Sequence, residues 1–148
     1  MRVKYIENNE QWASEFTFYS EIKVRFSETD MYGHLNNTVP FIFFEQARIE
    51  FLEASGIQSE WNKRDGKTII VVADLQCDFL KQAYFGDTIK VYVKAQSVGT
   101  SSVDIHYLGK NQKGEPVFVG RGALVQLNPE TGKTIAFTDE EKHLLLGK

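Results

Sequence analysis

A carboxylate, an imidazole and an amide lie within one short polar stretch of the chain. Asp30 stands four residues before His34 and seven residues before Asn37. A carboxylate can serve as a general base for water or as a nucleophile, and imidazole and amide groups can move protons or orient a carbonyl. This combination suits attack on an acyl carbon, provided that the surrounding elements also supply oxyanion donors and an apolar slot.

The residues after this stretch indicate the start of a helix. Asn36 and Asn37 are good N-cap residues, and Pro40 fits the first helical turn. We expect the helix to span residues 38–55 and to end at Gly56. Because the first N–H groups of a helix lack intrahelical acceptors, this helix start could stabilise a developing negative oxygen.

The predicted helix is rich in phenylalanine. At about 100° per residue, one broad face collects Phe41, Phe43, Phe44, Ala47, Phe51, Leu52 and Ala54. We expect this face to pack in the core, while Phe41 and Phe44, close to the helix start, also line a slot for an acyl chain. Arg48 points out of the same face, so it needs a buried carboxylate or carbonyl partner.

Alternating apolar and polar residues predict five strands. They span residues 20–27, 68–80, 88–97, 102–110 and 117–127. No linker or repeat divides the chain, so we expect one domain over residues 1–148, with its core at about residues 20–130. The element order predicts an α+β fold in which an antiparallel sheet of about five strands wraps around one long central helix.

Composition excludes several classes of protein. Of the 148 residues, 42% are hydrophobic and 25% are charged, which is typical of a globular domain. A net charge of −3 argues against a nucleic-acid partner. No apolar run approaches the ~18 residues of a membrane span, and the charged N-terminus lacks the apolar stretch of a signal peptide. We therefore expect a cytoplasmic protein with no membrane or nucleic-acid partner.

The cysteine and the remaining histidines give no sign of metal or redox chemistry. Cys77 is the only cysteine, and it alternates inward with Leu75 and Phe79, so we expect it to pack in the core. His106 and His143 have no ligand-like spacing around them. We expect no metal site.

Two segments carry a resemblance to a known family. Residues 25–37 read RFSETDMYGHLNN, and residues 44–48 read FEQAR. This pattern resembles the signature of hotdog-fold acyl-CoA thioesterases of the 4-hydroxybenzoyl-CoA thioesterase type. Element order and the turn formed by Phe85, Gly86 and Asp87 extend the resemblance over about residues 20–130. It implies hydrolysis of an acyl-CoA to a free acid and coenzyme A, with no cofactor beyond the coenzyme A of the substrate.

The resemblance also implies roles for individual residues. Asp30 matches the catalytic aspartate of the family, either as general base or as nucleophile through an acyl-enzyme anhydride, and the sequence leaves both open. Asn37 matches the polar position at the helix entrance. His34 lies at the offset where a histidine is implicated in catalysis in the related plant acyl-carrier-protein thioesterases, whereas in many bacterial relatives it is assigned no role. We expect the substrate to contact Gly33, Phe41 and Phe44.

The family pattern further implies an assembly, and it shows one departure. It implies a homodimer or homotetramer in which two sheets join edge to edge, with active sites where the loop and helix start of one subunit meet the other. Some bacterial relatives carry a tyrosine four residues before the aspartate, where this chain has Phe26. Any role of that hydroxyl is therefore lost here.

Other interpretations of the same residues stay open. Asp30 could simply cap a turn, the asparagines could only cap the helix, and His34 could hold the loop. A hotdog hydratase or dehydratase would pair a catalytic histidine before the helix with an acidic residue, often with a proline just before the histidine, and this chain lacks that pattern. A non-catalytic acyl-binding domain would not need Asp30.

A coenzyme A ligand also needs positive charge for its phosphates. Between residues 81 and 121 the chain has the cations Lys81, Lys90, Lys94, Lys110, Lys113 and Arg121 against three carboxylates. Solvated lysines on the wet face of a sheet explain the same excess. We therefore assign no phosphate-binding residue from the sequence.

Overall fold

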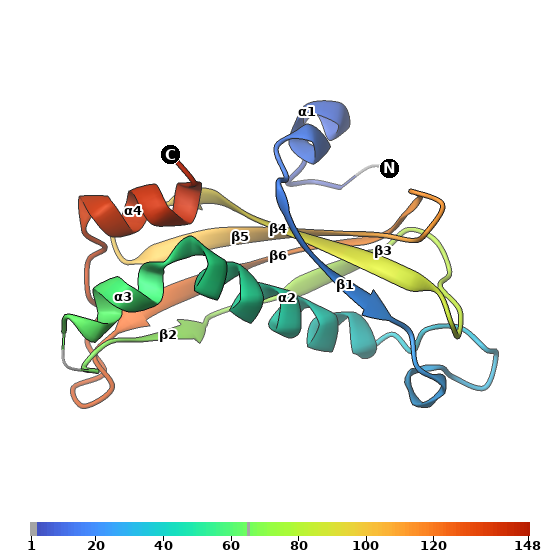
Figure 1. Cartoon of the computed structure of the whole chain (residues 1–148), viewed down its shortest axis with the longest axis horizontal. Helices are drawn as coiled ribbons and strands as arrows, with labels where there is room; N and C mark the ends of the chain where they lie inside the picture. Colours follow the sequence, from blue (N-terminus) through green and yellow to red (C-terminus); the bar gives the residue numbers. More distant parts are fainter. Residues whose placement is uncertain (1–2, 65) are drawn as a thin grey trace.

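The computed structural model describes residues 3–64 and 66–148, so Met1, Arg2 and Asp65, and with them part of the charged N-terminus considered above, lie outside it. The strands are β1 (Phe18–Lys23), β2 (Ile69–Val72), β3 (Gln76–Phe79), β4 (Thr88–Val98), β5 (Ser102–Lys110) and β6 (Pro116–Leu127). They form one antiparallel sheet in the order β1-β4-β5-β6-β2, and β3 also pairs with β6 (Figure 1). The sheet curls around the long helix α2 (Val39–Ser55), which confirms the predicted α+β architecture.

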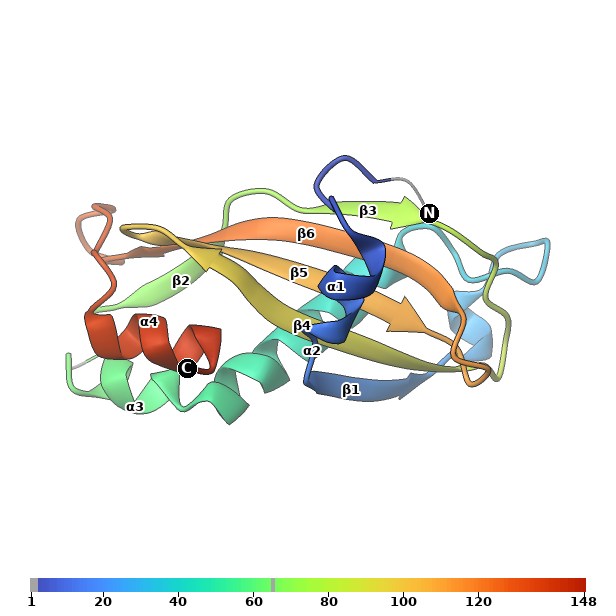
Figure 2. The same cartoon turned by 90° about the horizontal axis from the view of Figure 1, so that it is seen from above.

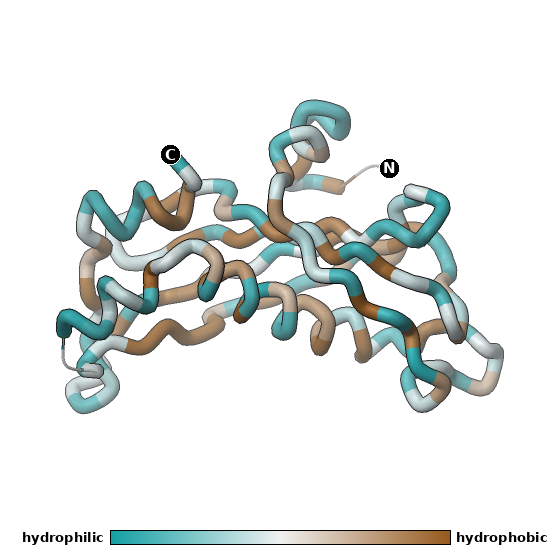
Figure 3. The backbone as a smooth tube through the Cα atoms, in the orientation of Figure 1, coloured by the Kyte–Doolittle hydropathy of each residue, from teal (hydrophilic) through white to brown (hydrophobic). Residues whose placement is uncertain are grey.

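Helix α2 lies along the inner face of the sheet and supplies much of the core. It ends at Gly56, as predicted, and its buried residues include Phe43 and Ala47. Strand residues such as Val91 and Ile105 are fully buried in the same cluster. Figure 3 shows hydrophobic positions along the strands and α2, and hydrophilic positions on most turns. The core therefore fixes α2 across the sheet, with its N-terminal end beside the polar loop that precedes it.

The single strand predicted over residues 68–80 is wrong, because two short strands, β2 and β3, pair with separate parts of β6. Asp74 explains the break between them. Its Oδ1 accepts the N–H of Ala123 on β6 at 2.7 Å, so a side chain takes a donor that a continuous strand would bond through its backbone. The same hydrogen bond holds the pKa of Asp74 below its ordinary value.

The first strand was also misplaced, since β1 begins and ends earlier than predicted. The residues expected to complete it form a short 3-10 helix, η1 (Phe26–Glu28). The chain turns there because the N–H of Arg25 donates to Oε1 of Glu28 at 2.8 Å. Phe26, which the strand pattern placed on the inward face, is 75% exposed and packs edge to face against Phe85.

Three helices that the sequence patterns did not indicate flank the core. They are α1 (Asn9–Ser14), α3 (Ile57–Asn62) and α4 (Asp139–Leu146). Helix α1 lies on the outer face of the sheet, with α2 on the opposite face (Figure 2). A second hydrophobic cluster forms under it from Val3, Ile6, Trp12, Phe16, Leu108 and Val119. No helix within the described part of the chain is long and apolar enough to cross a membrane.

Candidate active site

Asp30 lies in a tight loop between η1 and α2. Its N–H donates to the carbonyl of His34 at 2.8 Å, and its carbonyl accepts the N–H of Gly33 at 3.0 Å. Outside these bonds, Thr29 and Leu35 form an isolated antiparallel bridge. Gly33 has φ +78°, a left-handed conformation that residues with a side chain rarely adopt. These features close the loop on itself and fix the backbone of Asp30.

The carboxylate of Asp30 is oriented by the same loop. Its Oδ1 accepts the N–H of Tyr32 at 2.8 Å and the N–H of His34 at 3.2 Å. No hydrogen bond to its Oδ2 comes from residues 3–64 or 66–148. One oxygen of this half-buried side chain is therefore held in place, while the other is left for a further partner.

A buried carboxylate holds the entry to the loop. Glu28 accepts the N–H of Arg25 at 2.8 Å and its guanidinium Nη2 at 3.1 Å. The carbonyl of Glu28 also accepts the N–H of Asn36 at 2.8 Å. Burial raises the pKa of Glu28, but the hydrogen bonds from Arg25 outweigh this effect, and the pKa lies below its ordinary value. Glu28 is therefore ionised at neutral pH and ties both ends of the loop together.

The structure brings Asp30, His34 and Asn37 to the wall of one cavity of about 530 Å³. This volume is within the range of roughly 300–1,000 Å³ that is usual for small-ligand pockets. The rest of the wall consists of Leu35, Phe79, Leu80, Lys81, Gln82, Ala83, Val117 and Phe118. A carboxylate, an imidazole and an amide thus share a space with apolar side chains that an acyl group could contact.

The second wall of this cavity was not identified from the sequence. Residues 79–83 reach it through the topology, because β3 pairs with β6. Beyond β3, Leu80 and Lys81 donate their N–H groups to the carbonyl of Val117 at 2.9 and 3.2 Å. The sequence placed Phe79 and Leu80 in a predicted strand and gave Lys81 a positive charge, but neither signal marks a wall opposite Asp30.

The start of α2 offers fewer donors than the sequence suggests. Oδ1 of Asn36 accepts the N–H and the hydroxyl of Thr38, at 3.0 and 2.9 Å. The N–H of Val39 bonds to the carbonyl of Asn36 at 3.0 Å, and Pro40 has no N–H. The side-chain amide of Asn37 makes no hydrogen bond to any described residue. This amide is therefore a free polar group at the helix entrance.

All three residues predicted to contact the substrate lie outside the cavity wall. Gly33 forms the turn, and Phe41 is partly exposed on α2. Phe44 is fully buried and stacks on Tyr107 with ring centroids 4.3 Å apart. The Phe44 ring can lie this close to the sheet because Gly120 has no side chain. A Cβ at Gly120 would come within 2.5 Å of the ring. For these three residues a substrate contact stays a prediction.

Arg48 is buried, as predicted, but its partner is neither a carboxylate nor a carbonyl. Its Nη1 donates to the hydroxyl of Tyr107 at 3.1 Å. Burial raises the pKa of Tyr107, so the hydroxyl is neutral and accepts the bond. The sequence could not indicate this partner, which lies 59 residues away.

Two of the six cations between residues 81 and 121 are occupied inside the fold. Lys94 donates to the carbonyl of Trp12 at 2.9 Å, and Nη2 of Arg121 pairs with Asp104 at 2.7 Å. Of the six, all of which are described, only Lys81 lines the Asp30 cavity, and its ammonium pairs with Glu115. The positive charge available to a phosphate is therefore smaller than the sequence suggests.

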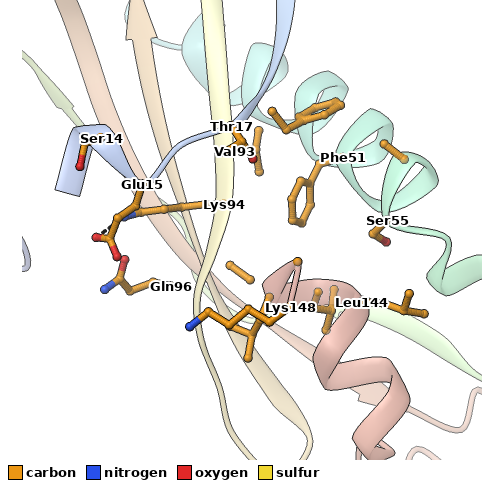
Figure 4. A pocket seen from close by; sticks show the side chains of 16 residues that line it. Ser14, Glu15, Thr17, Phe51, Ser55, Val93, Lys94, Gln96, Leu144 and Lys148 are labelled. Carbon is orange, nitrogen blue, oxygen red and sulfur yellow. Dashed lines mark hydrogen bonds and ion pairs between the residues drawn. The ribbon is translucent and has the colours of Figure 1, made fainter. Parts of the chain in front are cut away.

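A second cavity, also of about 530 Å³, lies near the other end of α2 (Figure 4). Its lining includes Glu15, Phe51, Val93, Lys94, Gln96 and Leu144. Glu15 and Lys94 of this wall form an ion pair with each other at 3.3 Å. The cavity contains none of the residues predicted to do chemistry, so we place the candidate site at Asp30.

The one cysteine is accounted for by packing. Cys77 packs against the main core, as predicted, and burial raises its pKa to about 12, so the thiol is protonated at neutral pH. Within residues 3–64 and 66–148, no group of three or more His, Cys, Asp or Glu side chains is arranged to hold a metal ion.

Known proteins resemble this chain over most of its length. An uncharacterised protein of Bacillus subtilis (strain 168), YsmA, is 47% identical over 137 residues, which cover 93% of this chain and 90% of that protein. The chloroplastic acyl-acyl carrier protein thioesterase ATL3 of Arabidopsis thaliana is 35% identical over 111 residues, which cover 73% of this chain and 57% of that protein. The chain thus spans little more than half the length of the Arabidopsis relative.

A solved structure and a family model agree with these relatives. The structure of a Thermus thermophilus thioesterase complexed with coenzyme A and Zn is 29% identical and has a TM-score of 0.72, covering 90% of this chain and 98% of that one. This similarity confirms the expected hotdog fold. The model of the thioesterase-like superfamily matches residues 24–145. Because that match covers most of the chain, the protein belongs to the thioesterase-like superfamily.

Proposed function

We propose that the protein is an acyl-CoA thioesterase, which hydrolyses an acyl-CoA to a free acid and coenzyme A in the Asp30 cavity without a separate cofactor. The observation that carries the proposal is the Asp30 carboxylate, held by two backbone N–H groups on the wall of a partly apolar cavity. Membership of the thioesterase-like superfamily supports the reaction class. The coenzyme A bound by the Thermus thioesterase supports coenzyme A as the thiol part of the substrate.

In this mechanism Asp30 promotes attack on the thioester carbonyl. As a general base, its carboxylate takes a proton from water while the water oxygen bonds to the carbonyl carbon. As a nucleophile, it forms a mixed anhydride that water then hydrolyses. In both routes the carbon–sulfur bond breaks, and the thiolate of coenzyme A takes up a proton.

The neighbouring polar groups position the reacting atoms. The Asn37 amide can donate to the carbonyl oxygen of the substrate or orient the water. His34 is held beside the cavity by a backbone bridge to Tyr84 and by ring contact with it, at a centroid distance of 5.4 Å. Apolar wall residues such as Phe79 and Val117 contact the acyl group.

We also propose that the protein acts as a cytoplasmic homodimer, or a tetramer of two such dimers, joined through the β2–β3 edge. In the described chain both strands pair only with β6, so their outer backbone groups are open. The β2 part of the edge is apolar, as Figure 3 shows, and along the edge Ile69, Val71, Val72 and Phe79 are 36–56% exposed. Phe79 also lines the cavity, so a second copy would lie beside the site. A monomeric wild type in light scattering would contradict the dimer.

Thiol release tests the proposed reaction. Wild type and Asp30→Asn are assayed with a chromogenic disulfide reagent against short, long and aromatic acyl-CoAs, and against acyl-acyl carrier protein because the Arabidopsis relative bears that name. We expect wild type to release thiol and the variant to be slower by at least ~100-fold. The proposal is overturned if well-folded wild type releases no thiol, or if the variant matches it.

A further inference from the structure

The outer face of the sheet buries a row of charged and polar side chains beneath the N-terminal arm, which we define as residues 3–17. Lys94, His106 and Arg121 lie opposite one another on β4, β5 and β6. Lys94 is only 8% exposed and His106 only 1%. Burying such groups costs free energy that apolar residues would not cost. The row is therefore better suited to docking the arm in one fixed position than to adding stability.

Glu15 of the arm pairs with Lys94 at 3.3 Å, and two further hydrogen bonds between arm and row are made by Trp12. Its Nε1–H donates to Nδ1 of His106 at 2.8 Å, and its carbonyl accepts the ammonium of Lys94 at 2.9 Å. Because an indole nitrogen only donates, Nε2 of His106 carries the proton and donates it to Asp104 at 2.9 Å. Arg121 in turn donates to Asp104. Burial lowers the pKa of His106, which favours this neutral form.

The docked arm also reaches the wall of the Asp30 cavity. The second hydrophobic cluster contains four arm residues, Val3, Ile6, Trp12 and Phe16, and Leu80 packs against this cluster. Leu80 is at the same time part of the cavity wall. In Figure 2 the chain before α1 crosses the sheet toward β3, the strand that ends just before Leu80. Leu80 therefore belongs both to the cavity wall and to the hydrophobic cluster that contains the arm residues.

Phe79 is held by its pairing with Phe118 and Ala83 by burial in the main core, so apart from this packing the stretch between them, residues 80–82, has few fixed points. The N–H groups of Leu80 and Lys81 share one carbonyl acceptor, and the carbonyl of Ala83 accepts the N–H of Leu35 at 2.7 Å. The carboxylate of Asp30, in contrast, is fixed by its own loop. A displaced arm would thus release the wall without breaking the hydrogen bonds of the carboxylate.

We propose that the N-terminal arm is a positioning element for substrate: held by Trp12 and acting through Leu80, it fixes the 79–83 wall against which the acyl group lies. This inference rests on the proposed function of the Asp30 cavity. Freeing the arm raises KM and changes the ranking of acyl chain lengths. It leaves kcat nearly unchanged, because Asp30 is not displaced.

Two tryptophan variants test this role. Trp12→Phe removes the N–H but keeps an aromatic ring. Trp61→Phe is the matched control, because Trp61 is also buried and donates its Nε1–H to Oε1 of Gln126 at 2.7 Å, outside the arm. In Trp12→Phe we expect the amides of Leu80 and Lys81 to exchange about fivefold faster, as for the loss of one net hydrogen bond, and KM for long acyl-CoAs to rise several-fold. Neither quantity should change in Trp61→Phe.

Equal amide exchange in the two variants would overturn the inference, and so would an unchanged KM in Trp12→Phe. Exchange is measured without substrate, so a wild type that releases no thiol refutes the proposed function separately from the contact between arm and wall. If Trp12→Phe does not fold, Leu80→Ala removes the same contact from the other side. An unchanged KM and chain-length ranking in Leu80→Ala would equally overturn it.

Discussion

Two loops of this molecule, residues 30–34 and 111–115, share their backbone hydrogen bonds but differ in their first residue. In each loop the first N–H donates to the fifth carbonyl, and the first carbonyl accepts the N–H of a glycine at φ +78°. In each, the first side chain accepts the N–H groups of the third and fifth residues through one oxygen. That first residue is Asp30 in one loop and Asn111 in the other.

The difference separates the structural role of this position from a chemical one. The oxygen of Asn111 is sufficient to build the turn, and its Nδ2 donates to Glu115 at 3.1 Å. A carboxylate is therefore not needed to build the same turn at Asp30, where no residue of the described chain bonds to the second oxygen. The comparison supports a chemical reason for the carboxylate over turn capping alone.

The largest expected effect comes from changing these two first residues. Asp30→Asn should keep the free energy of unfolding within ~0.5 kcal/mol of wild type, because Asn111 already builds this turn. It should nevertheless lose at least ~100-fold in thiol release. Asn111→Asp is the control and should keep its turnover. Urea unfolding and thiol release measure both quantities, and a strongly destabilised Asp30→Asn would assign the carboxylate to the fold instead.

The two glycines give the next largest effect. Gly33→Ala and Gly114→Ala should each lose about 1 kcal/mol of stability, because a Cβ disfavours φ +78° although it would meet no atom within 4 Å. Only Gly33→Ala should also reduce thiol release, since it shifts the turn that holds Asp30. Denaturant midpoints and kcat/KM distinguish the two variants. Equal kcat/KM in both would mean that the turn does not set the activity.

The glutamate at the entry to the first loop gives a smaller, pH-dependent effect. In the folded protein the pKa of Glu28 lies below its ordinary value of 4.5, so the unfolded chain binds more protons in this acidic range. The contribution of ionised Glu28 to stability is present above the pKa of the unfolded chain, and it is lost as pH falls through the pKa of the folded protein. Glu28→Gln should lower the free energy of unfolding by less than ~1 kcal/mol at neutral pH. It should also make the decrease in stability between neutral and acidic pH smaller than in wild type. Thermal unfolding from neutral pH to about pH 3 measures it, and parallel profiles would contradict the assignment.

Local sequence patterns predicted the long helix α2 but missed the short helices α1, α3 and α4. The stop of α2 at Gly56 depends on neighbouring residues, and it was predicted correctly. The break between β2 and β3 depends on a hydrogen bond that Asp74 accepts from the N–H of a residue 49 positions away, which alternation does not record. The turn at η1 depends on Glu28, whose bond to Arg25 is local but does not alter the apolar pattern.

The candidate site likewise has one part that local sequence shows and one part that depends on distant contacts. Asp30, His34 and Asn37 lie on one short segment, so their spacing was visible in the sequence. The facing wall, residues 79–83, depends on the antiparallel pairing of β3 with β6. The bond between Trp12 and His106 joins residues 94 positions apart, and nothing in their local sequence indicates it.

The smallest expected change in stability concerns a contact between the second loop and the first site. Glu115, the last residue of the 111–115 loop, pairs with Lys81 on the wall of the Asp30 cavity. Both side chains are exposed, and such pairs contribute little to folding. Glu115→Gln should therefore leave the midpoint of unfolding unchanged, while it frees the Lys81 ammonium beside the cavity.

The freed ammonium should strengthen binding of an anionic acyl-CoA. KM in Glu115→Gln should fall by up to about threefold at low ionic strength, and the difference should disappear in roughly 0.5 M salt, because salt screens exposed charges. Lys81→Met in the same background is the control and should remove the gain. An unchanged KM at low salt would place the phosphates of the substrate away from Lys81, and the functional difference between the two loops would then rest on the Asp30 carboxylate alone.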